Sequence, residues 1–195
     1  MRKYVIMGPQ GSGKGTQAGL LARGFDLVHI SVGDIFRWHV QNRTKLGTRI
    51  QRYMNEGRLV PDEMVSDVVK WRLDNHDWRH GFVLDGFPRT LAQAEALDDM
   101  LEEIGRELDV ILEFQLDENT SIRRMLGRAA EEGRADDTPE VMRKRLELYR
   151  EMTLPVVEHY RATGKLVGIH ADRPIPDVYA EVQQALEQVR SRTVR

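Results

Sequence analysis

The chain has 195 residues, a size typical of one domain with a small insertion, and its net charge is −2. This near-neutral charge gives no support to nucleic-acid binding, and the absence of cysteine excludes disulfides and thiolate metal sites. No apolar stretch is long enough for a membrane helix, and the N-terminal apolar run is too short for a secretion signal, so we expect a cytoplasmic protein.

The first predicted element is a strand at Tyr4–Met7, and it opens a series of short apolar segments rich in β-branched residues. The others are Leu27–Ile30, Phe82–Leu84, Val110–Leu116 and Leu166–Ile169. Because these segments are apolar on both faces and helical patterns separate them, we expect a parallel sheet that is covered on both sides. The predicted fold class is α/β, with three layers built from a five-stranded parallel sheet and helices on both faces.

A glycine-rich segment, GPQGSGKGTQ at Gly8–Gln17, separates the first strand from a helix that begins near Gly13. A strand, a glycine turn and a helix in this order form a nest of backbone N–H groups that binds phosphate oxygens. Lys14 adds a mobile positive charge for the β- and γ-phosphates. Gly15 stands where such loops normally carry the serine or threonine that contacts magnesium, and Thr16 follows one position later. A simple turn with a surface lysine is the alternative, and the flanking elements argue against it.

Two segments fit the alternation of strands and helices less well. Residues 31–60 predict two short helices, around Asp34–Val40 and Gly47–Glu56, with no strand between them. Residues 127–138 are polar and charged. We expect both segments to add little to the hydrophobic core and to form mobile subdomains. The core domain then consists of residues 1–30, 61–126 and 139–195.

Helical periodicity is clearest over residues 90–108, where apolar residues recur at intervals of three or four and predict one continuous helix. Other helices are predicted from Pro61 onward, over residues 139–160 and over residues 176–190. Proline is tolerated at the first position of a helix, but Pro155 lies inside the third of these and should bend or break it.

A set of motifs spread over nearly the whole chain carries a family resemblance. The motifs are GPQGSGKGTQ, HISVGDIFR (His29–Arg37), GRLVPDEMV (Gly57–Val65), GFVLDGFPRTLAQAEAL (Gly81–Leu97), RRMLGR (Arg123–Arg128), GRADD (Gly133–Asp137) and RKRLELYREMTLPVVEHY (Arg143–Tyr160). In order and spacing they resemble the adenylate kinases, which are P-loop nucleoside monophosphate kinases. The lid motif is short and lacks cysteine and histidine, so the chain resembles the short-lid form and we expect no structural zinc.

The resemblance implies that residues 31–60 bind the nucleoside monophosphate, that residues 127–138 form a short lid and that the glycine loop binds ATP. Asp85 ends a predicted strand at the carboxyl edge of the sheet, where ligands bind in open α/β folds. A carboxylate there can hold magnesium through water, with a turn or cap aspartate as the alternative, and Thr16 is a second candidate for magnesium. The expected ATP contacts are Gly11, Ser12, Gly13, Lys14, Gly15, Thr16, Arg124, Arg128 and Arg173.

The acceptor, AMP, is expected on the other side of the loop. Thr90 and Gln93 form a capping box, which explains Gln93 without a ligand. In the family the matching glutamine reads the adenine edge, for which an amide supplies both a donor and an acceptor. Val32 departs from the family, where threonine is common, and leaves the strictness of AMP selectivity open. The expected AMP contacts are Val32, Arg37, Arg58, Leu59, Val60, Gly86, Phe87, Pro88, Arg89, Gln93, Arg134 and Arg145.

Cations make up the expected catalytic set. Arg124 and Arg128 lie four residues apart, so one helical face presents both. Each arginine alone could be a solvated surface residue, but two nucleotides bring several negative phosphates into one pocket. The attacking phosphate oxygen is already ionised and needs no general base, so no histidine is assigned a role. The predicted catalytic residues are Lys14, Arg89, Arg128, Arg134 and Arg145.

The predicted function is that of an adenylate kinase, the reversible magnesium-dependent transfer of the terminal phosphate of ATP to AMP, which gives two ADP and maintains adenine nucleotide balance. Lid closure in adenylate kinases is an established example of substrate gating, and the resemblance implies it here. The alternatives are a UMP/CMP kinase, favoured by Val32 and opposed by Gln93, and a catalytically silent nucleotide-binding regulatory module. We expect a monomer, because the subdomains must swing freely, with small nucleotides as partners and neither nucleic acid nor membrane.

Overall fold

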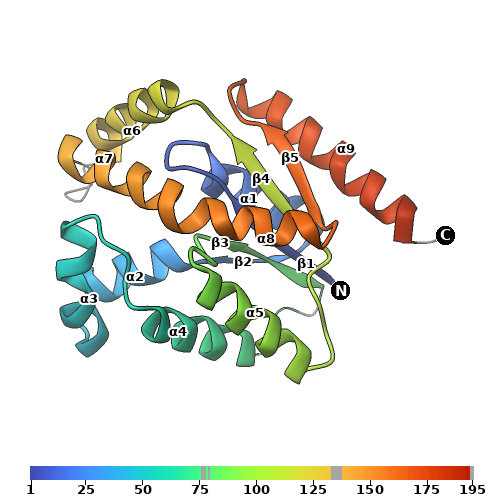
Figure 1. Cartoon of the computed structure of the whole chain (residues 1–195), viewed down its shortest axis with the longest axis horizontal. Coiled ribbons are helices and arrows are strands. Elements are labelled where there is room, and N and C mark those ends of the chain that lie inside the picture. Colours follow the sequence, from blue (N-terminus) through green and yellow to red (C-terminus); the bar gives the residue numbers. More distant parts are fainter. Residues whose placement is uncertain (76–77, 79, 133–137, 194–195) are drawn as a thin grey trace.

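The computed structural model describes residues 1–75, 78, 80–132 and 138–193. Its centre is a parallel sheet with the strand order β2-β3-β1-β4-β5 (Figure 1). In that order the strands are Val28–Ser31, Gly81–Asp85, Arg2–Met7, Val110–Gln115 and Leu166–His170. Each predicted strand segment is therefore confirmed, with bounds that differ by one or two residues. Because all strands run the same way, their carboxyl ends meet at one edge of the sheet.

Alternate residues of the strands point to two separate hydrophobic clusters, one on each face of the sheet. Val5 and Leu84 belong to one cluster, whereas Ile6 and Val83 belong to the other. Each of these side chains is at most 1% exposed, and burial of such a side chain stabilises the fold by about 1.5–3 kcal/mol. A strand buried on both faces has no polar side, which is why its sequence is continuously apolar.

Helices cover both faces, as the sequence predicts, and complete three layers (Figure 1). Helices α1 and α9 pack on one face, while α4, α5 and α8 pack on the other together with α2 and α3. Their bounds are α1 Lys14–Phe25, α2 Val32–Gln41, α3 Lys45–Asn55, α4 Asp62–Asp74, α5 Leu91–Glu103, α6 Glu118–Glu132, α7 Pro139–Leu148, α8 Leu154–Ala162 and α9 Ile175–Thr193. Within the described chain, no helix is long and apolar enough to cross a membrane.

The prediction of one helix over residues 90–108 is wrong at its C-terminal end. Helix α5 stops at Glu103, because Gly105 adopts a left-handed conformation (φ 64°) and the Arg106 N–H turns back to the Leu101 carbonyl at 2.8 Å. Ile104 is consequently 40% exposed, while Leu108 reaches the core from the loop that follows. The apolar spacing persists through the turn, so periodicity alone does not locate the helix end.

Residues 31–60 contribute more to the core than the sequence suggests. Val32, Phe36 and Ile50 are buried at 5% exposure or less and belong to the same cluster as the sheet. The expectation that this segment adds little to the core is wrong, because its helices bury one face against α4 and the sheet. Its role as a separate moving subdomain stays a prediction.

The helix predicted over residues 139–160 is not one regular α-helix, because its geometry changes just before Pro155. A π-helical segment, Tyr149–Thr153, joins α7 to α8, and the Leu154 N–H donates to the Tyr149 carbonyl. The wider turn directly precedes the residue that lacks an N–H donor. Of the predicted lid, residues 127–132 continue α6, and residues 133–137 lie outside the described residues.

Candidate active site

The glycine loop connects β1 to α1 at the carboxyl edge of the sheet, as the sequence predicts. Gly8 has a φ of 146°, and a Cβ there would lie 2.6 Å from the Phe114 carbonyl oxygen. A Cβ on Gly11 would lie 2.7 Å from the Ser121 carbonyl oxygen. Within the described residues, no side chain caps the start of α1, so its first N–H groups are available to an anion. The loop therefore needs glycine to pack against β4 and α6 and leaves bare backbone facing the pocket.

Lys14, the first residue of α1, folds back over this loop. Its Nζ donates to the Pro9 carbonyl at 2.7 Å and to Ser12 Oγ at 3.4 Å. Burial lowers the pKa of the Lys14 ammonium, the Asp85 carboxylate partly opposes this shift, and the resulting pKa is about 8. The cations Arg89 and Arg128 act in the same direction as burial. A phosphate that entered here would give the Lys14 ammonium a charged partner in place of neutral oxygens.

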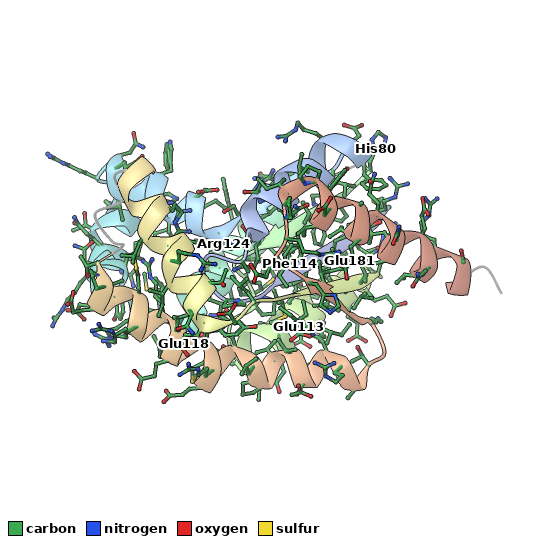
Figure 2. The ribbon with its side chains drawn as sticks, turned by 90° about the horizontal axis from the view of Figure 1, so that it is seen from above. His80, Glu113, Phe114, Glu118, Arg124 and Glu181 are labelled. Carbon is green, nitrogen blue, oxygen red and sulfur yellow. The ribbon has the colours of Figure 1, made fainter. Side chains whose placement is uncertain are left out.

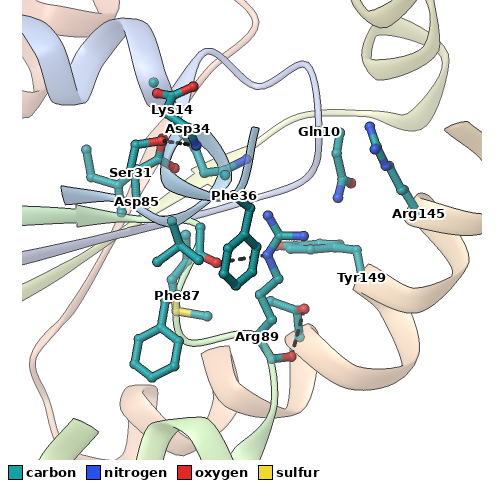
Figure 3. A pocket seen from close by; sticks show the side chains of 18 of the residues that line it. Gln10, Lys14, Ser31, Asp34, Phe36, Asp85, Phe87, Arg89, Arg145 and Tyr149 are labelled. Atoms are coloured by element: carbon teal, nitrogen blue, oxygen red, sulfur yellow. Dashed lines mark hydrogen bonds between the residues drawn. The ribbon is translucent and has the colours of Figure 1, made fainter. Parts of the chain in front are cut away.

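Asp85 ends β3 beside the loop (Figure 3). Its side chain is 13% exposed, and its Oδ2 lies 3.9 Å from His29 Nε2 and 3.5 Å from the position that a Cβ on Gly15 would take. His29 is a pocket residue that the sequence analysis missed; its Nε2 is buried and has no hydrogen-bond partner within the described residues. Only the pairing of β2 with β3 brings this histidine next to Asp85, so strand order was the missing information.

The side chains near Asp85 determine which metal ion this part of the pocket could hold. The structure places no group of three or more His, Cys, Asp or Glu side chains for a metal among the residues that it describes. One carboxylate facing a phosphate loop fits magnesium, which binds through one or two carboxylates, substrate phosphates and water. Thr16 also lines the pocket.

The segment 31–60 supplies another wall of this pocket. Ser31 caps α2 by accepting the Asp34 N–H at 3.3 Å, and Arg37 pairs with Asp34 at 2.5 Å. Although burial opposes it, these hydrogen bonds hold the pKa of Asp34 below its usual value. Arg58 pairs with Glu56 at 3.1 Å and lies over the Tyr53 ring. The predicted acceptor residues Val32, Arg37, Arg58, Leu59 and Val60 all line the pocket.

Residues 86–89 follow β3 in the chain, precede α5 and line the pocket. Their Phe87–Pro88 peptide bond is cis. Arg89 Nε donates to the Gly86 carbonyl at 2.9 Å, and Thr153 Oγ1 donates to the Arg89 carbonyl at 3.0 Å. Burial lowers the pKa of the Arg89 guanidinium, and the nearby charge of Arg145 adds to the shift. Arg89, Arg145 and Tyr149 all line the pocket, and Figure 3 labels their side chains.

The sequence left two interpretations of Gln93 open, a helix cap and a contact to the adenine edge, and the structure has features of both. The Gln93 N–H donates to Thr90 Oγ1 at 3.2 Å, so the threonine caps α5 as expected. The Gln93 side chain, however, accepts the N–H of Arg89 at 2.8 Å rather than that of Thr90, and its Nε2 donates to Asp62 Oδ1 at 2.7 Å. The side chain also lines the pocket. Asp62 was not a candidate, because residues 31 positions apart in the chain give no local signal.

Arginines of α6 and α7 form another part of the pocket lining. Arg124, Arg128 and Arg145 line the pocket with the loop and the 31–60 segment. Figure 2 shows Arg124 projecting from α6 toward the centre of the molecule, where it donates to the Ala171 carbonyl at 2.9 Å. Arg173 does not line this pocket but a separate hollow; it pairs with Glu181 and donates to the His170 carbonyl at 3.3 Å. Arg134 lies outside the described residues.

A phosphate loop after β1, a sheet in the order β2-β3-β1-β4-β5 and a cationic pocket at its carboxyl edge define a P-loop nucleoside monophosphate kinase. A family model described as adenylate kinase matches residues 6–165. The chain is 43% identical over 194 residues to the adenylate kinase of Cyanothece sp., and the match covers 100% of both chains. It is 48% identical over 190 residues to the adenylate kinase of Thermobifida fusca, covering 97% of this chain and 99% of the relative.

The chain therefore belongs to the adenylate kinase family, and its activity is that of an ATP:AMP phosphotransferase. A third relative, the adenylate kinase of Bifidobacterium longum, is 44% identical over 185 residues, with 95% of this chain and 100% of the relative covered. Enzymes of this family use ATP with magnesium.

Proposed function

We propose that the pocket binds MgATP at the glycine loop and AMP against the 31–60 segment, and that the γ-phosphoryl group passes directly between them. The supporting observation is that one continuous pocket is lined both by the loop and by this segment. The side chains of Lys14, Arg89, Arg128 and Arg145 line the same pocket. Two nucleotides in one pocket explain why so many cations converge where the chain as a whole is nearly neutral.

In this proposal the chain contributes positioning and positive charge. Backbone N–H groups of the loop and Lys14 hold the β- and γ-phosphates of ATP, while Arg89, Arg128 and Arg145 compensate the charge that spreads over the transferred group. The attacking AMP phosphate oxygen is already ionised, so no side chain has to remove a proton.

Magnesium fits beside Asp85, which would hold it through water, with Thr16 as a second candidate. When bound, the ion would supply positive charge to the ATP phosphates. Arg124 and Arg173 are proposed on the ATP side. The proposed AMP contacts are Val32, Arg37, Arg58, Leu59, Val60, Gly86, Phe87, Pro88, Arg89, Gln93 and Arg145, together with Arg134 of the lid.

The segment 31–60 and the lid at residues 127–138 are proposed to close over the substrates and to exclude water, as lid closure does in adenylate kinases generally. Water competes with AMP for the phosphoryl group, so closure protects ATP from hydrolysis. Free movement of both segments favours a monomer, and a role in adenine nucleotide balance favours the cytoplasm.

The acceptor assignment is tested by measuring ADP formation from MgATP with AMP, UMP, CMP or GMP in turn. We expect AMP to give the highest kcat/KM, and ATP hydrolysis without an acceptor to be at least a hundredfold slower than transfer. An equal or higher kcat/KM with UMP or CMP would contradict the proposed adenine contacts. Rapid hydrolysis without AMP would contradict closure.

A further inference from the structure

The amide group of Gln93 is held at both ends by residues from different parts of the chain. Its Oε1 accepts the Arg89 N–H at 2.8 Å, and its Nε2 donates to Asp62 Oδ1 at 2.7 Å. The Gln93 residue is only 2% exposed. Asp62 is the first residue of α4, which lies beside α5 and follows the pocket segment Gly57–Val60 (Figure 1).

These two partners determine which end of the amide carries the oxygen. A backbone N–H only donates, and an ionised carboxylate only accepts. A Gln93 amide turned by 180° would face the Arg89 N–H with an NH₂ group and the Asp62 carboxylate with an oxygen, and both hydrogen bonds would be lost. A buried amide without partners is costly, so the observed orientation is strongly favoured.

With those bonds made, the amide still has one hydrogen on Nε2 and one lone pair on Oε1 for a ligand. It therefore offers a donor and an acceptor in a fixed order. A 6-aminopurine carries an acceptor at N1 beside a donor at the 6-amino group, which matches that order. A 6-oxopurine carries a donor at N1 beside an acceptor at O6, which is the reverse pattern and would require the turned amide.

We propose that Asp62 is a positioning residue that fixes the Gln93 amide and thereby makes the acceptor site selective for 6-aminopurine over 6-oxopurine monophosphates. This inference rests on the proposed contact between Gln93 and the acceptor base. Asp62 does not touch the nucleotide itself; it acts through Gln93. Selectivity in the acceptor site then depends on a carboxylate from α4 as well as on the amide from α5.

The substitution Asp62→Asn tests this role. An asparagine can donate as well as accept, so a turned Gln93 amide loses one hydrogen bond instead of two. In this variant the unturned amide can keep both hydrogen bonds, so we expect the KM values for AMP and for ATP to change less than about twofold. The turned amide costs less than before, so kcat/KM for IMP should rise and the ratio of kcat/KM for AMP to that for IMP should fall about tenfold. The ratio is measured on one preparation with two acceptors, so it does not depend on the fraction of enzyme that folds.

Glu63→Gln is the matched control, because Glu63 is exposed, also lies in the first turn of α4 and loses the same charge on substitution. Its KM values and its AMP-to-IMP ratio should stay within twofold of those of the unmodified enzyme. If Asp62→Asn and Glu63→Gln behave alike, Asp62 acts only as a helix-terminal charge and the inference is overturned.

The variant Gln93→Ala separates this inference from the proposal beneath it. A KM for AMP and an AMP-to-IMP ratio that do not change in Gln93→Ala would overturn the base contact of Gln93, and the role of Asp62 with it. If Gln93→Ala changes both values, adding Asp62→Asn to it should have no further effect on the ratio. A further fall of the ratio in the double variant would show that Asp62 acts by another route, and would overturn only the present inference.

Discussion

At the proposed donor end of the pocket, bare backbone and positive charge dominate, whereas the proposed acceptor-base end is built from apolar groups and one buried amide. Lys14 lies on the glycine loop among guanidinium groups, and burial lowers its pKa to about 8. Gln93 and Val32 at the other end carry no charge and are at most 3% exposed. A cation attracts a phosphate from many directions, but an amide distinguishes bases only when its orientation is fixed. The acceptor-base end therefore needs neighbouring side chains that hold the amide in one orientation, whereas the donor end does not.

Replacing Lys14 tests the charged end and should have the largest effect. In Lys14→Met we expect kcat to fall by about 10²–10³-fold, because one preorganised charge on the transferred phosphoryl group is lost. The melting temperature should not fall, since the folded protein no longer buries an ammonium group. Steady-state kinetics and thermal unfolding measure both, with Lys70→Met as the control for an exposed lysine. Near-normal turnover would remove Lys14 from the mechanism.

The pH dependence of ATP binding sharpens the same comparison with a smaller effect. Lys14 is cationic below its pKa of about 8 and becomes neutral above it, so attraction for phosphate is present at pH 7 and is lost as the pH rises. We expect the Kd for ATP to increase about tenfold between pH 7 and pH 9 by calorimetry. Lys14→Arg keeps its charge over this range and should abolish the dependence. The same slope in that variant would assign the titration to another group.

The smallest effect is expected at the uncharged end, in Val32→Thr. Threonine is common at this position in the family that the motifs resemble, and its hydroxyl would add one polar contact to the acceptor base. We expect the KM for AMP to fall two- to threefold and the KM for ATP to stay constant, while stability falls by about 1 kcal/mol because the hydroxyl is buried. Kinetics with each nucleotide varied and thermal unfolding check this. A rise in the KM for AMP would show that the site is shaped for valine.

The difference between the two ends also explains what the sequence could predict. The phosphate loop is readable because its glycines, its lysine and the flanking strand and helix are contiguous, and the structure brings Lys14, Arg89, Arg128 and Arg145 into one pocket. The strands are readable because they are apolar on both faces. These features depend on neighbouring residues or on a motif with fixed spacing.

Other features depend on contacts between distant segments, and no local pattern reveals them. Asp62 meets Gln93 across 31 positions, and His29 meets Asp85 only because β2 pairs with β3. Helix α5 ends because the chain makes a left-handed turn at Gly105, although the apolar spacing continues to Leu108. Long-range pairing and backbone reversal are thus the physical information that the one-dimensional pattern lacks.

The parallel sheet has a practical consequence for handling this enzyme. The start of β1 and the end of α9 both lie on the side of the molecule away from α3 and α7 (Figure 1). An affinity tag, a fluorescent fusion or a surface tether joined through the start of β1 or the end of α9 would be attached on that side. The segments that are proposed to flank the nucleotides would remain unhindered, so immobilised molecules are suited to a single-molecule test of the proposed opening and closing.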